Sequence, residues 1–278
     1  MATDPNYIPR GPVETELSFY VPPADGATPF LYVEKPPAGQ PERNYGEAIH
    51  KVPLADIRGH EDEYNLDKDA FQVLRHVRSA TTRETFESDE AVAKVYYPEV
   101  ERLLLDHVPG AHKVIIFDHT IRLEDPNAHR QPVIRAHVDQ TPKAAEARVR
   151  LHVPDPQEAE ELLKGRYRII NVWRSINGPV QSTPLAFASA ASVDDADLVA
   201  VEHRYPTRTG ETMGVKYNPA QQWKYWSGMD DDERLFLKCS DTREDVAKRV
   251  PHSAFSDPRT PPGARPRESI EVRTIVFG

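Results

Sequence analysis

The 278-residue sequence contains a single cysteine, Cys239, so no disulfide bond can form within the chain. Its 35 lysine and arginine residues, against 44 aspartates and glutamates, form no basic cluster, and the net charge is −9. Nucleic acids and anionic membranes require clustered cations, so neither is an expected partner. We find no signal peptide and no run of about 20 apolar residues that would span a bilayer. These absences predict a cytoplasmic protein in a reducing compartment.

Proline is abundant, with 26 residues, and it is concentrated near the start of the chain. Stretches such as VPPADGATPF and VEKPPAGQPERNYG predict an irregular N-terminal arm over residues 1–50 that packs on the domain or covers an opening. No Gly/Ser-rich linker follows this arm. The sequence therefore predicts one domain over residues 51–278.

Helical patterns are few and carry clear start signals. Ser88, Thr141 and Asp155 each precede a helical pattern and are expected to be N-caps. Pro142 suits the first helical position after Thr141. Pro98 interrupts the pattern that begins at Ser88, so we expect two short helices there, separated at the proline.

The rest of the chain consists mainly of short runs of β-branched and aromatic residues bounded by Pro, Gly, Asp or Asn. These runs lie too close together for a helix between each pair. The spacing favours a mainly β protein, an antiparallel sandwich or barrel with a few flanking helices packed outside.

Two stretches contain a histidine and an aspartate separated by one residue: RGHEDEY, with His60 and Asp62, and IRAHVDQTP, with His137 and Asp139. Alternate residues of a strand share a face, so His137 and Asp139 project together if PVIRAHVD is a strand. Such a pair supplies two of the three ligands of a two-His, one-carboxylate Fe(II) site. A hydrogen-bonded strand end is the alternative. The acidic segment around His60 has no strand pattern and is typical of a solvated turn.

A third ligand has to come from further along the chain, where His152, His203 and His252 are candidates. His152 ends a helical pattern, and His203 lies within an alternating strand pattern. His252 lies between two strand-like runs, and the second of these, RESIEVRTIVF, distinguishes it from the other two histidines.

That run begins with Arg267 and Ser269, which share a face of the predicted strand. A guanidinium fork beside a hydroxyl group is a suitable receptor for a carboxylate. 2-Oxoglutarate requires such a receptor, because its keto acid end chelates iron while its far carboxylate is held some distance away. Arg273 lies on the same face and is the rival receptor.

Several collinear stretches from about residue 50 to the end carry a resemblance to a known family. They include DIRGHEDEYNLD, IFDHTIR, AHVDQTP, NVWRSINGPVQSTPLA, GETMGVKYNPAQQWKYW and PHSAFSDPRTPPGARPRESIEVR. The chain resembles the fungal and bacterial non-heme iron hydroxylases and desaturases, a family that includes gibberellin-desaturase-like proteins and relatives of the cephamycin methoxylation accessory protein. The resemblance implies a double-stranded β-helix, which is a jelly roll of the cupin type, that uses Fe(II), 2-oxoglutarate and O2.

By position, the resemblance implies that His137, Asp139 and His252 bind the metal and that Arg267 and Ser269 bind the cosubstrate. Asn171 and Arg174 are further candidates for cofactor binding, although they would point to opposite faces of a regular strand. The candidates for contact with the substrate or the metal ligands are His119, Arg122, Gln140, Trp173 and Tyr217. Core packing is an equal alternative for Trp173, and packing is favoured for the aromatic cluster that contains Tyr217.

The predicted function is therefore hydroxylation, desaturation or ring closure of a small secondary metabolite by abstraction of hydrogen from a C–H bond, with release of succinate and CO2. No residue beyond the metal ligands is expected to be catalytic. Two alternatives stay open: a Zn²⁺-type hydrolase on the same fold, and a non-catalytic accessory protein of a biosynthetic pathway. A homodimer is compatible with the sequence, which does not establish it.

Overall fold

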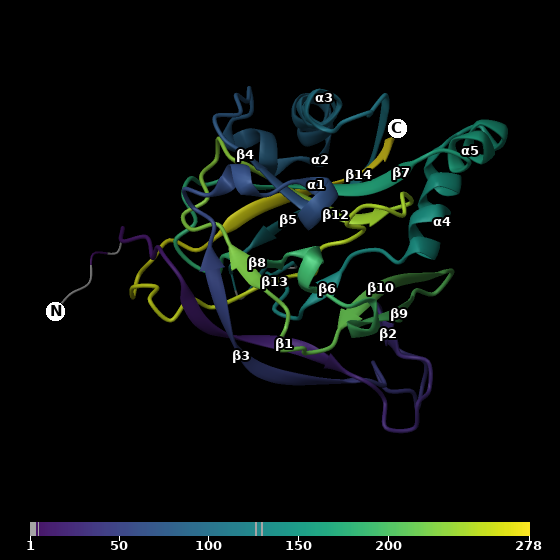
Figure 1. The fold of residues 1–278 in the computed structure, drawn as a ribbon, viewed down its shortest axis with the longest axis horizontal. Helices are drawn as coiled ribbons and strands as arrows, with labels where there is room; N and C mark the ends of the chain where they lie inside the picture. Colours follow the sequence, from purple (N-terminus) through teal and green to yellow (C-terminus); the bar gives the residue numbers. More distant parts are fainter. Residues whose placement is uncertain (1–3, 5, 126, 129) are drawn as a thin grey trace.

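The structure, a computed structural model, describes residue 4 and residues 6–125, 127–128 and 130–278. Among these residues, nine strands form one sheet and five form a second sheet. The two sheets lie against each other (Figure 1), and apolar side chains from both pack together between them. Most neighbouring strands are antiparallel. Two pairs are parallel: β11 (Trp223–Tyr225) with β3 (Gly46–Asp56), and β2 (Phe30–Tyr32) with β9 (Leu198–Arg204). The predicted antiparallel architecture with helices outside is confirmed.

The larger sheet contains the strands that carry the predicted metal ligands. In spatial order its members are β1 (Val13–Val21), β3 (Gly46–Asp56), β11 (Trp223–Tyr225), β8 (Leu185–Ala188), β13 (His252–Ala254), β6 (His137–Val138), β10 (Thr209–Val215), β9 (Leu198–Arg204) and β2 (Phe30–Tyr32). The smaller sheet consists of β4 (Phe71–Leu74), β12 (Arg234–Asp241), β7 (Tyr167–Ser175), β14 (Glu268–Phe277) and β5 (Lys113–Leu123).

The proline-rich N-terminal region contributes strands to the larger sheet. β1 pairs with β3 along its whole length, from Val13 opposite Leu54 to Val21 opposite Gly46. The sheet also curls back on itself, because the Ser18 carbonyl accepts a hydrogen bond of 2.8 Å from the N–H of Ala136, next to β6. The boundary expected at residue 50 falls within β3, and residues 1–3 and 5 of the expected arm lie outside the described residues.

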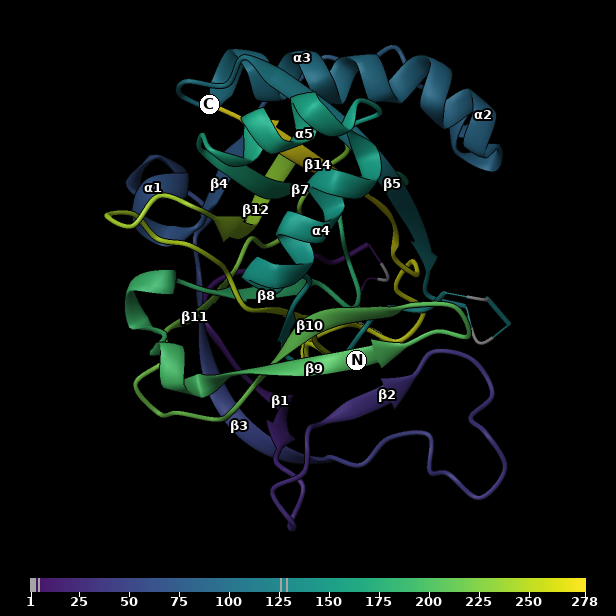
Figure 2. The ribbon, with the colours of Figure 1, turned by 90° about the vertical axis from the view of Figure 1, so that its right-hand side faces the viewer.

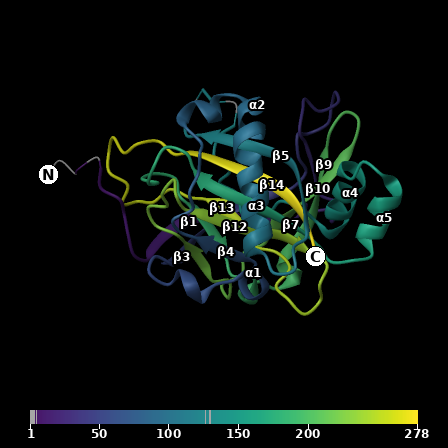
Figure 3. The ribbon, with the colours of Figure 1, turned by 90° about the horizontal axis from the view of Figure 1, so that it is seen from above.

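A long helical segment covers the outer face of the smaller sheet (Figure 3). It consists of α2 (Asp89–Ala91), a π-helical turn (Val92–Tyr96) and α3 (Tyr97–His107), in direct succession. The expected second helix is therefore present as α3, with Pro98 in its first turn, but the expected separation at the proline is wrong. In the π-helical turn the N–H of Tyr97 bonds to the Val92 carbonyl, and Pro98, which has no N–H to donate, falls in the first turn of α3.

The other helices are α1 (Leu66–Asp69), α4 (Pro142–His152) and α5 (Pro156–Leu163), and α4 and α5 lie side by side at one end of the sandwich (Figure 2). The three predicted N-caps are confirmed. The Ser88, Thr141 and Asp155 side chains accept hydrogen bonds from the N–H groups of Ala91, Ala144 and Gln157. The Thr141 cap starts α4 directly after the predicted metal ligands of β6.

β7 is buried on both faces, because α3 covers one side and the larger sheet covers the other. Ile170 and Val172 pack towards α3, while Trp173 packs between the sheets against Phe187 of β8. The alternation that places Trp173 and Asn171 in the interior places Arg174 on the helix side. As predicted, the Asn171 and Arg174 side chains point to opposite faces of β7.

Replacing Leu104 with alanine should test the packing of α3 on the smaller sheet. Leu104 is fully buried, so Leu104→Ala should lower the free energy of unfolding by about 2–5 kcal/mol. Leu151→Ala on α4 is the matched control, because Leu151 is 64% exposed and its loss should change stability by less than about 0.5 kcal/mol. Equal destabilisation in urea titrations would contradict this packing.

Candidate metal centre

Three predicted ligands converge on the inner side of the larger sheet. β13 pairs with β6 so that His252 lies directly opposite His137, and Asp139 follows β6. The Asp139 Oδ1 atom lies 3.2 Å from Nε2 of His137 and 3.8 Å from Nε2 of His252. Ligand atoms of all three residues lie within 4.8 Å of one another. Two imidazoles and one carboxylate therefore meet as a metal site requires.

The backbone orients both imidazole rings. Nδ1 of His137 lies 2.8 Å from the Arg135 carbonyl, and Nδ1 of His252 lies 3.3 Å from the Val250 carbonyl. A carbonyl can only accept, so each Nδ1 carries a proton, and each Nε2 is the ring nitrogen that a metal would bind. Burial, with the charge of His137, lowers the pKa of His252 to about 4, which keeps its ring neutral near pH 7.

The Asp139 carboxylate is held through its other oxygen. Oδ2 accepts hydrogen bonds from Nδ2 of Asn171 at 2.8 Å and from Nε of Arg273 at 3.0 Å. Burial acts to raise the pKa of Asp139, but the hydrogen bond with His137 and the charge of Arg273 outweigh it and lower the pKa well below its usual value. The carboxylate is therefore ionised, with Oδ1 directed at the histidines.

This donor set fits Fe(II). Two neutral imidazoles and one carboxylate are the ligands of the facial triad, which leaves further coordination positions for a cosubstrate and oxygen. The centre is also enclosed: His252 is buried, and His137 and Asp139 are mostly buried. The predicted triad of His137, Asp139 and His252 is thus brought together by the fold.

A small pocket lies on one side of the histidines. Trp173, Arg267, Ser269 and Glu271 are among its lining residues, together with His137 and His252. The Arg267 guanidinium is only 2% exposed; one Nη donates to the Thr183 carbonyl at 2.6 Å, and Nε has no hydrogen-bond partner among the described residues. Burial lowers the pKa of Arg267 to about 10, so this arginine is still cationic at neutral pH.

Arg273, the rival carboxylate receptor, is already engaged. Besides Asp139, it binds Asp118 through Nη1 at 2.8 Å and Glu271 through Nη2 at 3.2 Å. Its guanidinium is therefore surrounded by three carboxylates. Arg267, by contrast, has an unpaired Nε and forms no ion pair within the described part of the chain.

Four other predicted residues lie near the centre. Asn171 donates a hydrogen bond to the Asp139 carboxylate and is not among the residues that line the Arg267 pocket. Trp173 and Arg122 line the Arg267 pocket, with the Trp173 ring 5.6 Å from the Arg267 guanidinium. Gln140 lines a second cleft next to Asp139.

Three predicted residues lie elsewhere. His119 faces the helix side of β5, where Nδ1 lies 2.8 Å from the Tyr97 hydroxyl, because strand alternation turns it away from the inward-facing Thr120 and Arg122. Arg174 is likewise on the helix side, where it donates to hydroxyl groups of two residues, Ser79 and Thr81. Tyr217 lies beyond the end of β10 and stacks on His50 at 3.8 Å. None of the three lines the metal centre.

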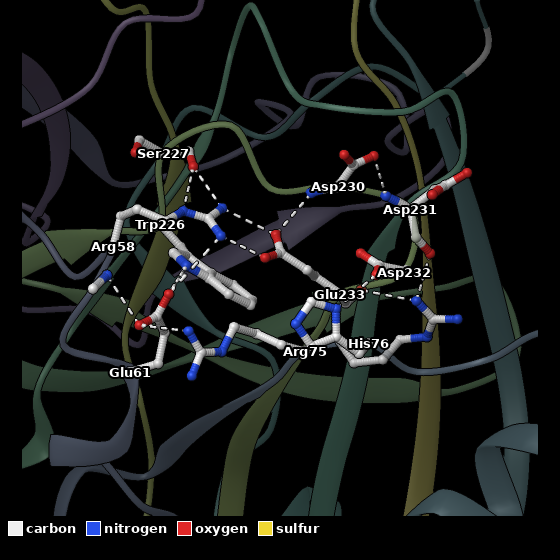
Figure 4. Close-up of polar contacts among 12 residues, drawn as sticks. Arg58, Glu61, Arg75, His76, Trp226, Ser227, Asp230, Asp231, Asp232 and Glu233 are labelled. Carbon is white, nitrogen blue, oxygen red and sulfur yellow. Dashed lines mark hydrogen bonds and ion pairs between the residues drawn. The ribbon is translucent and has the colours of Figure 1, made fainter.

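The other His-x-Asp sequence contains Glu61, which belongs to the polar cluster around Trp226 (Figure 4). His60 is exposed and pairs with Glu63, as expected of a solvated turn. The residue between His60 and Asp62, Glu61, is buried and accepts a hydrogen bond from Nε1 of Trp226 at 3.1 Å. Arg58 stacks on the same indole at 4.5 Å. The predicted packing role of the aromatic segment around Trp226 is confirmed.

Two arginines of the second cleft, Arg148 and Arg208, were not found by sequence reasoning. The cleft has a volume of about 320 Å³ between α4 and the β9–β10 hairpin, and Asp139 belongs to its wall. Arg148 and Arg208 line it, as does His203, which pairs with the Thr212 hydroxyl at 3.0 Å instead of joining the metal ligands. Only the fold brings the middle of α4 next to a hairpin about 60 residues later in the chain.

Two facing sheets with a two-His, one-carboxylate centre between them define the class of jelly-roll, non-heme iron oxygenases. Comparison with known proteins agrees. A family model described as "Oxidoreductase/YMDC permease-like domain" matches residues 17–277. No helix among the described residues is long and apolar enough to cross a membrane.

Individual relatives match over almost the whole chain. The hydroxylase/desaturase poxK of Penicillium oxalicum is 36% identical over 300 residues, which cover 97% of this chain and 92% of the relative. The Fe(II)/2-oxoglutarate-dependent dioxygenase nvfI of Aspergillus novofumigatus is 32% identical over 272 residues, 95% of this chain and 96% of the relative. A solved structure of the iron and alpha-ketoglutarate-dependent endoperoxidase NvfI matches with a TM-score of 0.88 at 30% identity, covering 97% and 99% of the two chains.

The chain belongs to this family of Fe(II)/2-oxoglutarate-dependent oxygenases. The predicted family, enzyme class and jelly-roll fold are confirmed, as are the cofactors Fe(II), 2-oxoglutarate and O2 that the family implies. The alternatives of a Zn²⁺-type hydrolase and a non-catalytic accessory protein are not favoured.

The two His-x-Asp sequences provide a matched test of the metal centre. The double variant His137→Ala, Asp139→Ala removes two of the three converging ligands and should retain almost no Fe(II), where the unaltered protein should hold about one ion per chain. The matched variant His60→Ala, Asp62→Ala should retain iron normally, because His60 is in an exposed turn. Iron would be measured after anaerobic loading and desalting, with circular dichroism as the folding control. Equal retention by both variants would refute the assignment.

Proposed function

We propose that this enzyme hydroxylates, desaturates or cyclises a small secondary metabolite at a C–H bond while converting 2-oxoglutarate to succinate and CO2. The observation that supports this most is the convergence of His137, Asp139 and His252 beside a pocket that contains a buried, incompletely paired Arg267. The names of relatives, hydroxylase/desaturase and endoperoxidase, support the same range of outcomes.

The Arg267 pocket is the proposed site for the cosubstrate. Its far carboxylate would bind the Arg267 guanidinium and the Ser269 hydroxyl, while the Trp173 ring limits the width of the pocket. The free volume between the lining side chains is only about 20 Å³. A dicarboxylate therefore requires lining side chains to shift as it enters.

When bound, Fe(II) with 2-oxoglutarate and O2 supplies the oxidising chemistry that removes hydrogen from a C–H bond. The residues of this chain bind and orient. Arg273 and Asn171 hold the Asp139 carboxylate so that Oδ1 faces the metal position, and the backbone carbonyls of Arg135 and Val250 hold the two imidazoles. No side chain is needed as a general acid or base, and the choice of hydrogen depends on how the substrate is positioned.

A small-molecule substrate is consistent with the size of the clefts. We also propose a cytoplasmic location and keep the homodimer as a prediction. The roles assigned to Arg122, Gln140 and Trp173 are part of this proposal, as is the division into an arm over residues 1–50 and a domain over residues 51–278.

Two arginine variants should separate cosubstrate binding from metal binding. Arg267→Gln removes the proposed receptor charge, so the 2-oxoglutarate concentration for half-maximal succinate formation should rise by about 10- to 100-fold, with iron retention unchanged. Arg273→Gln removes a contact to Asp139 and should mainly lower iron retention. The proposal fails if Arg273→Gln raises the 2-oxoglutarate concentration for half-maximal succinate formation and Arg267→Gln leaves it unchanged.

A further inference from the structure

The second cleft, between α4 and the β9–β10 hairpin, and the Arg267 pocket adjoin different sides of the metal centre. Asp139 lines this cleft, whereas His137 and His252 line the Arg267 pocket, so the metal position lies between the two. Figure 2 shows α4 next to the β9–β10 hairpin, which are the two walls of the cleft. A molecule bound there would lie beside the metal position without occupying the cosubstrate pocket.

The acidic groups of this cleft are already paired. Nζ of Lys143 binds Oε1 of Glu211 at 2.6 Å, and the Asp139 carboxylate is bound by Arg273. These pairs leave the cleft with two further cations on its wall, Arg148 and Arg208.

Neither of these arginines forms an ion pair with a carboxylate within the described part of the chain. Arg148 is half-buried and stacks on the Phe117 ring at 4.9 Å, with a long contact of 3.5 Å from Nη1 to Nε2 of His152. Asp118, whose charge acts on Arg148, is bound to Arg273. Arg208 is exposed and stacks on the Tyr205 ring at 3.9 Å. Stacking holds each guanidinium by its face and leaves its N–H edge for a ligand.

The two cations also act on each other. Burial lowers the pKa of Arg148, and the nearby charge of Arg208 lowers it further. An anion bound between the two guanidinium groups would relieve this repulsion and satisfy their N–H donors. The side of the cleft that α4 forms also carries an apolar strip: Ala144, Ala147 and the exposed Leu151 line the same cleft.

We propose that the substrate carries a carboxylate, which Arg148 and Arg208 bind in this cleft, and an apolar portion that packs on Ala144, Ala147 and Leu151. This inference rests on the proposed function and adds the chemical class of the substrate, an apolar carboxylic acid. The carboxylate anchors the molecule at the rim while the apolar portion places a C–H bond next to the metal position. Neutral analogues bind weakly because they leave both arginines without an anion.

The test compares an acid with its neutral isostere. The probes are 4-phenylbutyrate and 4-phenylbutanamide, titrated into protein with Zn²⁺ as a diamagnetic ion at the metal centre and with saturating 2-oxoglutarate in the Arg267 pocket. Binding is followed by saturation-transfer NMR. We expect the acid to bind at least about tenfold more tightly than the amide. Arg148→Gln and Arg208→Gln should each weaken the acid severalfold, and the double variant should abolish the preference.

The pair of changes Lys143→Gln, Glu211→Gln is the matched control, because the two residues form an ion pair in the same cleft and their joint replacement leaves its net charge unchanged. It should keep the preference for the acid. The inference is overturned if the unaltered protein binds neither probe, binds acid and amide equally, or keeps its preference in the double arginine variant. Calorimetry with 2-oxoglutarate separates this inference from the proposed function. The double arginine variant should bind 2-oxoglutarate as tightly as the unaltered protein does. If the unaltered protein does not bind 2-oxoglutarate, the result counts against the proposed function instead.

Discussion

The carboxylate of Asp139 connects the two sheets at the metal centre. Its Oδ2 atom is held by Asn171 of β7 and Arg273 of β14, which belong to the smaller sheet. Its Oδ1 atom faces His137 of β6 and His252 of β13, which belong to the larger sheet. The position of Asp139 relative to the two histidines therefore depends on how the sheets pack. The apolar clusters between the sheets set that packing.

The residues after Asp139 stabilise this arrangement. Thr141 caps α4 and also donates a hydrogen bond of 2.8 Å to Glu211 of β10, so the start of the helix is tied to a strand that pairs with β6. α4 then runs beside the β9–β10 hairpin and encloses the second cleft. A single short segment thus supplies a metal ligand, fixes its position and begins one wall of the proposed substrate site.

The sequence predicted those features that depend on local order along the chain. His137 and Asp139 project together because they alternate on a strand, and the N-caps at Ser88, Thr141 and Asp155 follow from side-chain chemistry. His252 was selected from three candidate histidines by the strand that follows it, and the fold places it opposite His137.

The positions that the sequence alone does not reveal depend on which layer covers each face of a strand. His119 and Arg174 lie on strands with both faces covered, where apolar periodicity does not tell the interior from the helix side. Tyr217 follows β10, which pairs with β6, but its ring stacks on His50 of β3. Arg148 and Arg208 have no motif, because their cleft forms only when α4 meets the hairpin.

The central claim is that iron bound by His137, Asp139 and His252 adjoins a site for 2-oxoglutarate. The most direct measurement is anaerobic addition of 2-oxoglutarate to the Fe(II)-loaded protein, followed by visible absorption. Chelation of the iron by the keto acid should produce a weak metal-to-ligand charge-transfer band that appears only when both are present. Folded protein that binds iron but shows no such band at saturating 2-oxoglutarate would contradict the account.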